Sequence, residues 1–246
     1  MATARRELDR PAFYALRSGG WRDLVTLLHP PYTAWHLSYV ALGAAAAPTL
    51  HADRLWAALG AFFLAVGISA HALDELNGRP LGTSLSKRAL IALAVPALVG
   101  AVAIGVIGVI VVSPWLAPLV LVGPFLVLAY NLELAGGRFH NDTWFALAWG
   151  GFPAFTGYFS NALALRPAGL LVTAACCLLS VAQRRLSTPV RALRRRTAEV
   201  TGEQRLTDGS VMELDKAALS APLEGALSAL SLALVLLAAG LVAVRL

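Results

Sequence analysis

The feature that most constrains the fold is a series of apolar runs, each near 20 residues long, which short polar breaks separate. A helix of about 20 residues spans the hydrocarbon core of a bilayer. Hydrophobic residues make up 58% of the chain and charged residues only 14%, against about 25% charged in a typical soluble domain. The sequence therefore predicts an all-α, polytopic membrane bundle of about seven transmembrane helices. The expected spans are residues 32–50, 55–77, 88–112, 115–133, 141–163, 167–186 and 221–244.

The chain divides into an N-terminal segment and one membrane domain. Residues 1–31 mix Phe13, Tyr14 and Trp21 with Arg17 and Arg22, a pattern typical of an amphipathic segment on the membrane surface. They contain no apolar core of the signal-peptide type, so we expect the segment to be retained on the cytoplasmic side. Residues 32–246 form the single transmembrane domain, in which the polar stretch 187–216 is predicted to be a cytoplasmic loop.

The basic residues indicate the orientation in the membrane. With a cytoplasmic N-terminus, 17 of the 20 Lys and Arg residues, including Arg5 and Arg6, fall on the cytoplasmic side, and only Arg54, Arg166 and Arg245 fall outside. This asymmetry follows the positive-inside rule. The asymmetry also accounts for the net charge of +6, so a nucleic-acid partner is not needed to explain the positive charge. Since the chain is rich in Ala, Leu, Gly and Arg, we expect a multi-pass protein of a bacterial cell (inner) membrane.

A first polar cluster closes the second apolar run. His71, Asp74 and Glu75 follow residues 55–70 directly, and positions i, i+3 and i+4 share one face of a helix. We expect these side chains to converge, with His71 deepest, because ionisable groups at membrane depth usually face the bundle interior or a wet cavity. The alternative is a solvated helix end with Asp74 and Glu75 in the cytosol.

A second polar cluster lies between the fourth and fifth expected spans, on the same side of the membrane. It carries Tyr130, Asn131, Glu133, Arg138 and His140. Two glycines at positions 136 and 137 allow a tight turn that brings Glu133 and His140 toward each other. The sequence thus predicts one cytoplasm-facing cavity that both clusters share.

Other polar residues near this cavity keep more than one interpretation. Asp142 fits a helix N-cap as well as a site residue. His36 either reaches the cavity or is simply hydrogen-bonded beside Trp35 and Tyr39. The basic run of residues 184–196 either marks topology and contacts anionic lipid, or holds a phosphorylated ligand.

The two clusters admit two kinds of metal chemistry. Carboxylates at a cytoplasmic cavity can hold Mg²⁺, which prefers oxygen ligands and bridges substrate phosphates. A mixed nitrogen and oxygen set suits Fe, Mn or Zn instead. The candidate ligands are His71, Asp74, Glu75, Glu133 and His140.

Three stretches carry a resemblance to the UbiA superfamily of intramembrane prenyltransferases. Residues 21–43, through His29-Pro30-Pro31, resemble the entry into the family's first span. Residues 74–82 resemble the end of its first aspartate-rich motif and the Asn…Arg-Pro…Gly loop after it. Residues 130–158 resemble the loop and glycine-rich helix after its fourth span. The chain departs from the family in three ways. Its first motif keeps only one aspartate, and residues 183–189 lack the second motif. About seven spans are expected here, whereas the family typically has nine.

The resemblance implies a UbiA-like fold and roles for the residues that match. Asp74 and Glu75, with His71 beside them, would hold Mg²⁺ and form the catalytic centre. Basic residues of the loops would hold the diphosphate of an isoprenoid substrate while charge separates. The implied substrate-binding residues are Asn77, Arg79, Tyr130, Asn131, Arg138 and Arg184.

Three hypotheses for function follow. The first is an enzyme that transfers or cyclises a prenyl diphosphate or acts on another lipid-soluble substrate. The second keeps the fold but uses a metal site of histidines and carboxylates. The third is a non-catalytic, lipid-binding or accessory membrane protein. The sequence leaves the oligomeric state open.

Overall fold

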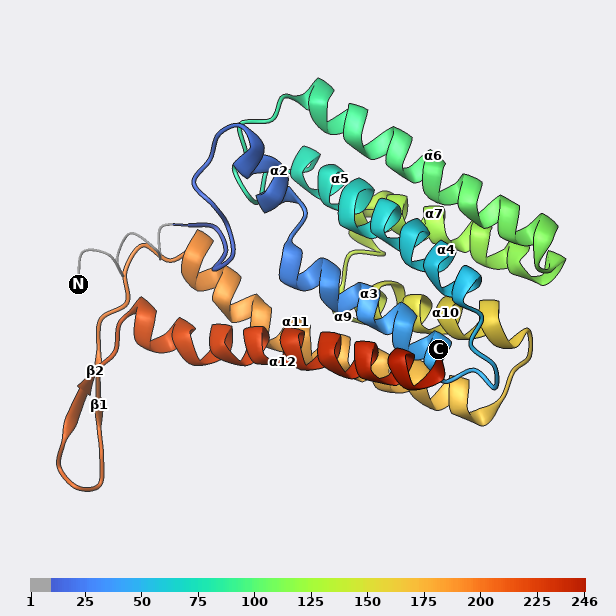
Figure 1. Ribbon diagram of the computed structural model, residues 1–246. Coiled ribbons are helices and arrows are strands. Elements are labelled where there is room, and N and C mark those ends of the chain that lie inside the picture. Colours follow the sequence, from blue (N-terminus) through green and yellow to red (C-terminus); the bar gives the residue numbers. More distant parts are fainter. Residues whose placement is uncertain (1–9) are drawn as a thin grey trace.

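The computed structural model describes residues 10–246, so Arg5 and Arg6 and the first part of the N-terminal segment lie outside the described residues. The chain is a bundle of helices, which confirms the prediction of a helical membrane protein (Figure 1). Within residues 10–246, five helical stretches are long and apolar enough to cross a membrane. These are Ala52–Leu76, Lys87–Val111, Pro114–Asn131, Pro167–Arg195 and Lys216–Arg245.

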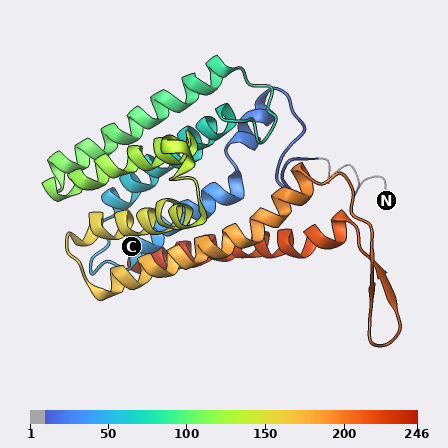
Figure 2. The same cartoon turned by 180° about the vertical axis from the view of Figure 1, so that it is seen from behind.

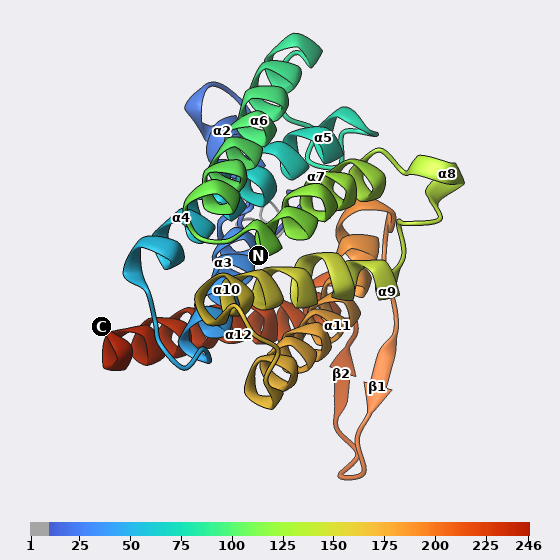
Figure 3. The same ribbon diagram turned by 90° about the vertical axis from the view of Figure 1, so that its right-hand side faces the viewer.

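The other two expected spans are helical but are not among these five, so the count of seven is not confirmed. Helix α3 (Pro30–Ala45) has only 16 residues, fewer than the about 20 that a bilayer requires. The second is a composite run of α9 (Asp142–Phe145), the π-helical η3 (Ala146–Gly151) and α10 (Phe152–Ala162). Both lie in the interior of the bundle, between longer helices (Figure 3).

The helices stack in successive layers, as both side and end views show (Figures 1 and 3). Helix α6 forms one outer layer, and the next contains α4, π-helical η1 and α5 together with the 3₁₀ turn η2 and α7. Helices α3 and α10 follow, and α11 and α12 form the opposite outer layer, where they run side by side (Figure 2). The bounds are α4 Ala52–Phe62, η1 Phe63–Ala70, α5 His71–Leu76, α6 Lys87–Val111, η2 Pro114–Leu116, α7 Ala117–Asn131, α11 Pro167–Arg195 and α12 Lys216–Arg245.

The central helices α3 and α10 touch backbone to backbone through glycine. A Cβ atom on Gly43 would lie 1.9 Å from the carbonyl oxygen of Ala154, and one on Gly157 would lie 2.1 Å from that of Val40. Both distances are far inside van der Waals contact, so only glycine fits at these two positions. The contact fixes the second half of α3 against α10, and Tyr32 and His36 in the first half of α3 line the cavity described below.

Residues 187–216 are not the continuous polar loop that the sequence predicted. Helix α11 continues past Pro189 to Arg195, nine residues beyond the expected end at 186. The basic side chains in its last turn, Arg194 and Arg195, favour this extension because cations stabilise a helix C-terminus. A short hairpin of β1 (Glu203–Arg205) and β2 (Val211–Glu213) then projects from the bundle (Figure 1).

The N-terminal segment folds back against the end of the bundle at which α11 ends. Its helix α2 (Trp21–Leu27) exposes Trp21 and buries Leu27, in agreement with an amphipathic helix. Arg195 donates from Nε to the carbonyl oxygen of Pro11 (3.1 Å), which anchors the segment to α11. At the far end of the bundle, Arg245 donates to the carbonyl oxygens of Ala47 and Pro48. The orientation of these two ends relative to the cytoplasm stays a prediction.

Candidate functional site

A cavity of about 520 Å³ lies where the N-terminal segment, α3, α5, α7 and α11 meet, and we call it the polar cavity. It brings together the two polar clusters that the sequence placed on one side. Its lining includes these predicted residues: His36, His71, Asp74, Asn77, Tyr130, Asn131, Glu133, His140 and Arg184. Residues of both clusters therefore lie at one cavity in the structure, although Glu75 and Arg138 are not among its lining residues.

Aromatic rings form much of the wall of the polar cavity. One group comes from the N-terminal half: Phe13, Tyr14, His29, Tyr32 and His71. The other comes from α3, α7, the loop before α9 and the composite α9–α10 run: His36, Tyr130, His140, Phe145 and Trp149. A ligand in this cavity is thus surrounded by ring faces and edges with few aliphatic side chains among them.

Helix α11 supplies the positive charge of the polar cavity. Arg184, Arg191 and Arg195 all line it, and their spacing of seven and then four residues places them on one face of the helix. Arg184 is engaged already, because its Nε is 2.8 Å from Oδ1 of Asp142 and its guanidinium lies over the ring of Phe145. Arg191 forms no ion pair with any described carboxylate, so its charge is free to act on a ligand.

The first polar cluster is split. His71 and Asp74 line the cavity, whereas Glu75 is fully buried behind it. Glu75 accepts hydrogen bonds from the backbone N–H of Leu81 (2.9 Å), and from the backbone N–H (2.8 Å) and hydroxyl (2.9 Å) of Thr83. The expectation that three side chains converge is therefore wrong for Glu75, whose carboxylate anchors the loop after α5.

The asparagines of both clusters join α5 to α7. The side chain of Asn77 donates to the carbonyl oxygen of Asn131 (3.2 Å), and that of Asn131 donates to the carbonyl oxygen of Val127 (2.7 Å). His140 packs its ring on Tyr130 with centroids 4.4 Å apart, and its Nδ1 is 3.0 Å from the carbonyl oxygen of Tyr130. Glu133 lines the rim in the left-handed backbone region, at φ 50°.

Two predicted phosphate ligands lie outside the polar cavity. Arg79 is exposed and donates to the carbonyl oxygen of Thr83 (3.0 Å), and Arg138 is exposed on the loop after α7. Asp142 is not the N-cap of α9, because Asn141 accepts from the N–H of Trp144 and Asp142 pairs with Arg184. His36 is hydrogen-bonded to the carbonyl oxygen of Trp149 (2.8 Å) and still lines the cavity, so both of its interpretations apply.

Sequence reasoning missed the contribution of Tyr14 and His29 to the polar cavity. The hydroxyl of Tyr14 and Nδ1 of His29 are hydrogen-bonded at 2.5 Å, and the ring of His29 stacks on His71 with centroids 4.2 Å apart. Burial, with His71, Arg195 and Arg191 nearby, lowers the pKa of His29 well below its usual 6.5, so its imidazole is neutral at pH 7. The sequence placed Arg191 and Arg195 in the basic run of residues 184–196, but only Arg184 was named as a substrate-binding residue, because α11 was expected to end at residue 186. The helical spacing of these arginines from Arg184 was a visible signal.

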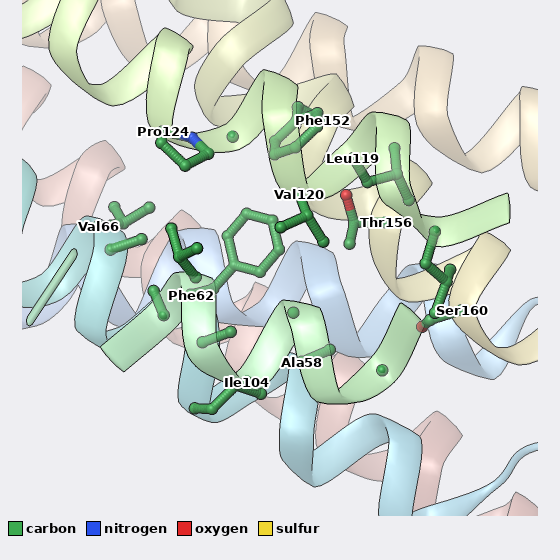
Figure 4. Close-up of a pocket in the computed structure, with 18 of the residues that line it drawn as sticks. Ala58, Phe62, Val66, Ile104, Leu119, Val120, Pro124, Phe152, Thr156 and Ser160 are labelled. Atoms are coloured by element: carbon green, nitrogen blue, oxygen red, sulfur yellow. The ribbon is translucent and has the colours of Figure 1, made fainter. Parts of the chain in front are cut away.

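A second, apolar cavity of about 150 Å³ lies between α4, α6, α7 and α10 (Figure 4). Small residues leave the space, among them Ala58, Ala61 and Gly105, and the ring of Phe62 projects into it. Val66 and Trp149 line this apolar cavity and also the polar cavity. The two cavities are therefore neighbours that share a wall.

Among residues 10–246, no three His, Cys, Asp or Glu side chains are grouped closely enough to hold a metal ion by themselves. The polar cavity still contains oxygen ligands, since Asp74 and Glu133 both line it. The carboxylate of Asp74 forms no hydrogen bond with another described residue, which leaves both of its oxygens for a cation.

Comparison with known proteins gives no relative from which a function could be transferred. No model of a protein family matches the chain, and no curated protein or solved structure matches it either.

Proposed function

We propose that this chain is an intramembrane enzyme that binds a prenyl diphosphate and transfers or cyclises its isoprenoid group. The observation that carries this proposal is the pair of neighbouring cavities. One is lined by arginines, two carboxylates and aromatic rings, and the other is apolar. An amphiphile with an anionic head and a hydrocarbon tail matches that sequence of surfaces. The UbiA-like fold, with about seven spans, remains part of this proposal.

The head group is assigned to α11. Arg191 and Arg195 line the polar cavity one helical turn apart, and a guanidinium binds phosphate oxygens through paired, charge-assisted hydrogen bonds. Their positive charge would also stabilise the diphosphate as its bond to carbon breaks. Arg184 would contribute less, because Asp142 already neutralises part of its charge.

Magnesium fits the residues that remain. A hard cation prefers carboxylate and phosphate oxygens and keeps several waters, so it does not require a cage made of protein alone. Asp74, with Glu133 at the rim, would hold Mg²⁺ together with the diphosphate. Such an ion would neutralise the leaving group. Fe, Mn or Zn bound by His71, His140 and the carboxylates remains the alternative for the same cavity.

The aromatic lining favours chemistry through a carbocation. Loss of diphosphate from an allylic substrate leaves positive charge on carbon, and ring faces stabilise a cation by about 0.5–2 kcal/mol each. Tyr130 and Trp149 lie edge to face with centroids 5.5 Å apart, beside the shared wall between the two cavities. An allylic carbon at this position would have its diphosphate near α11 and its tail in the apolar cavity.

The test is release of inorganic diphosphate from farnesyl diphosphate by the purified protein in lipid nanodiscs with Mg²⁺. Replacing both Arg191 and Arg195 with glutamine should reduce release by at least about 100-fold, since each charged hydrogen bond is worth about 1.5–3 kcal/mol. The matched control is Arg185→Gln, an exposed arginine of α11 that does not line the cavity. Product analysis then separates transfer from cyclisation.

Two results would overturn the proposal. If farnesyl, geranyl and geranylgeranyl diphosphates all stay intact, the chain is better described as a lipid-binding or accessory protein. If the double variant and Arg185→Gln have equal activity, the head group lies elsewhere. A stoichiometric transition metal in the purified protein would instead favour the histidine and carboxylate alternative.

A further inference from the structure

The hairpin of β1 and β2 packs against no helix of the bundle. Residues 203–213 are all exposed, and no hydrogen bond or ion pair joins them to a helix in the part of the chain that the structure describes. A two-stranded hairpin alone is at best marginally stable in water and needs a further surface to pack against. That surface must come from outside the described residues.

The hairpin extends across the direction of the helices. It connects α11 to α12 at the end of the bundle that holds the polar cavity, which we call the polar end, and it projects past the layer that these two helices form (Figures 1 and 3). A strand rises about 3.3 Å per residue, so residues 202–208 reach roughly 20 Å, about twice the diameter of a helix. Since α11 and α12 are both long and apolar enough to cross a membrane, the hairpin extends along the membrane surface, over whatever lies beside α12.

Both faces of the hairpin lack a partner, and each has a reason to require one. Successive residues of a strand point to opposite faces, so one face carries Glu203 directly opposite Glu213 and the other carries Met212 opposite Gln204. Like charges directly opposite each other destabilise a strand pair, and neither carboxylate forms an ion pair with a described residue. Met212 is 50% exposed. Contact with a cationic surface would relieve the repulsion between the carboxylates and cover the methionine.

The charge of the hairpin is opposite to that of the polar end. Residues 199–213 carry four carboxylates and one arginine, a net charge of −3, so the rest of the chain carries +9 to give the total of +6. Several exposed basic side chains around the polar end form no ion pair with any described residue: Arg17, Arg22, Arg79, Lys87, Arg88 and Arg138.

A second copy of the chain is the partner that fits this charge. Anionic lipid head groups repel a hairpin of net negative charge. The basic polar end attracts it, and loop charges insert every copy in the same orientation, so the polar end of a neighbouring copy lies at the same membrane surface. The hairpin of one copy therefore lies at the depth of the basic surface of the next.

We propose that the chain pairs with a second copy of itself in the membrane, and that the hairpin of each copy lies across the polar end of the other. In a twofold pair the same surface of both copies is buried, so the two hairpins make equivalent contacts. Glu203 and Glu213 bind the basic side chains of the other copy, and Met212 is covered. The pairing goes beyond the proposed function and does not depend on it, because none of these three residues lines the polar cavity.

Photo-crosslinking tests where the hairpin lies. The full-length protein carries p-benzoylphenylalanine in place of Thr207, at the turn of the hairpin, and is reconstituted into liposomes of zwitterionic lipid. Half of the copies are labelled with ¹⁵N, so mass spectrometry distinguishes a crosslink between two copies from one within a single copy. We expect crosslinks between copies, and we expect them on peptides of the polar end.

Energy transfer between copies that carry donor and acceptor dyes measures the strength of pairing in the same liposomes. Glu203→Lys with Glu213→Lys should weaken pairing by about 10-fold, which a few exposed ion pairs together account for. Glu203→Thr with Glu213→Thr replaces the repulsion by a favourable Thr–Thr pair, so the hairpin is kept, and pairing should still weaken. The control is Asp53→Lys, an exposed carboxylate at the start of α4, far from the polar end, and it should have no effect.

Three results would overturn the inference. The protein could stay monomeric at every density in the membrane, or the crosslinks from position 207 could reach only lipid or residues of the same copy. The threonine variant could also pair as strongly as the wild type. Failure of the proposed function would look different, because a protein that releases no diphosphate but still pairs through its hairpin leaves this inference intact.

Discussion

Helix α10 packs in opposite ways on two of its sides. On the side of α3, Gly157 lies so close to the backbone that a Cβ would be 2.1 Å from the carbonyl oxygen of Val40. On the side of α6 and α7, its residues Phe152, Thr156 and Ser160 line the apolar cavity (Figure 4). One helix thus belongs both to the tightest contact of the interior and to the wall of an open space.

The difference shows that the effect of a glycine on helix packing depends on whether it faces backbone or side chains of the neighbouring helix. Gly43 and Gly157 face backbone, and the helices close onto them. Gly108 and Gly123 face side chains, with the nearest atoms of Leu116 and Phe152 at 3.5 and 3.4 Å from a Cβ, and both line the apolar cavity. Stability should therefore depend most on the α3 side, and ligand specificity on the α6–α7 side.

The largest effect on stability is expected from adding one methyl group to α10 on the side that packs against α3. Gly157→Ala must separate α3 from α10, because the atom it meets is backbone and cannot rotate away. We expect a loss of about 3 kcal/mol in the free energy of unfolding, or failure to fold. Gly108→Ala adds the same methyl group where the nearest atom is a leucine Cδ1 at 3.5 Å, and it should cost little. Unfolding in mixed micelles with increasing SDS measures both, and equal losses would refute the comparison.

The next test extends the comparison to the carboxylates of the polar end. Glu75→Gln leaves one acceptor oxygen for the three donors of Leu81 and Thr83, and turns an NH₂ group toward them. A buried donor left unsatisfied costs about 1–3 kcal/mol, so we expect the free energy of unfolding to fall by that amount. The control is Glu133→Gln at the exposed rim, which should leave stability unchanged. The same SDS titration would contradict this if both variants unfold like the wild type.

A third test fills the apolar cavity on the side of α6 and α7. Ala58→Phe places a ring in the apolar cavity, where it should displace the isoprenoid tail and weaken binding of farnesyl diphosphate by about 10-fold, or roughly 1.4 kcal/mol. Binding of inorganic pyrophosphate should not change, because its site on α11 is separate. Ala103→Phe on the exposed face of α6 is the control. Calorimetry with both ligands measures the effect, and equal losses for the two ligands would mean that the tail lies elsewhere.

What the sequence allowed us to predict depended on local periodicity. Apolar runs located the helices, and basic loops placed His71 and His140 at one end of the bundle. Periodicity also assigned Glu75 to the face of Asp74, but α5 ends at Leu76 and the following loop folds back onto Glu75. That return depends on residues 81–83, which no helical pattern describes.

The continuation of α11 past residue 186 and the place of His29 in the cavity were missed for related reasons. A fall in hydropathy after residue 186 suggested a loop, although α11 continues because its basic face lines a cavity. His29 looked like a helix breaker before two prolines, and it does adopt left-handed φ and ψ of 46° and 57° at the start of α3. Its stacking on His71 joins residues 42 positions apart, and only the tertiary fold brings these together.

The smallest effect concerns the contact that holds α2 to the loop before α6. Asp23 is buried and accepts hydrogen bonds from the hydroxyl and the backbone N–H of Ser84 (3.0 Å for the latter). Burial opposes ionisation, but the hydrogen bonds from Ser84, with smaller contributions from Gly19 and Ser18, prevail and hold the pKa of Asp23 below its usual 3.8. Because the pKa is lower in the folded than in the unfolded state, the contact stabilises fully above pH 3.8 and is lost as the pH falls through the folded value.

Ser84→Ala should therefore lower the free energy of unfolding by about 1 kcal/mol at pH 7 and by less below pH 3.8. The control is Ser210→Ala in the hairpin, where Ser210 also lowers the pKa of Asp208, but on a carboxylate fully exposed to solvent. We expect no measurable change there, since water replaces the lost hydrogen bond. Thermal unfolding from pH 3 to pH 7 compares the two variants. A loss for Ser84→Ala that does not vary with pH would show that the hydroxyl acts by packing alone, without the charge of Asp23.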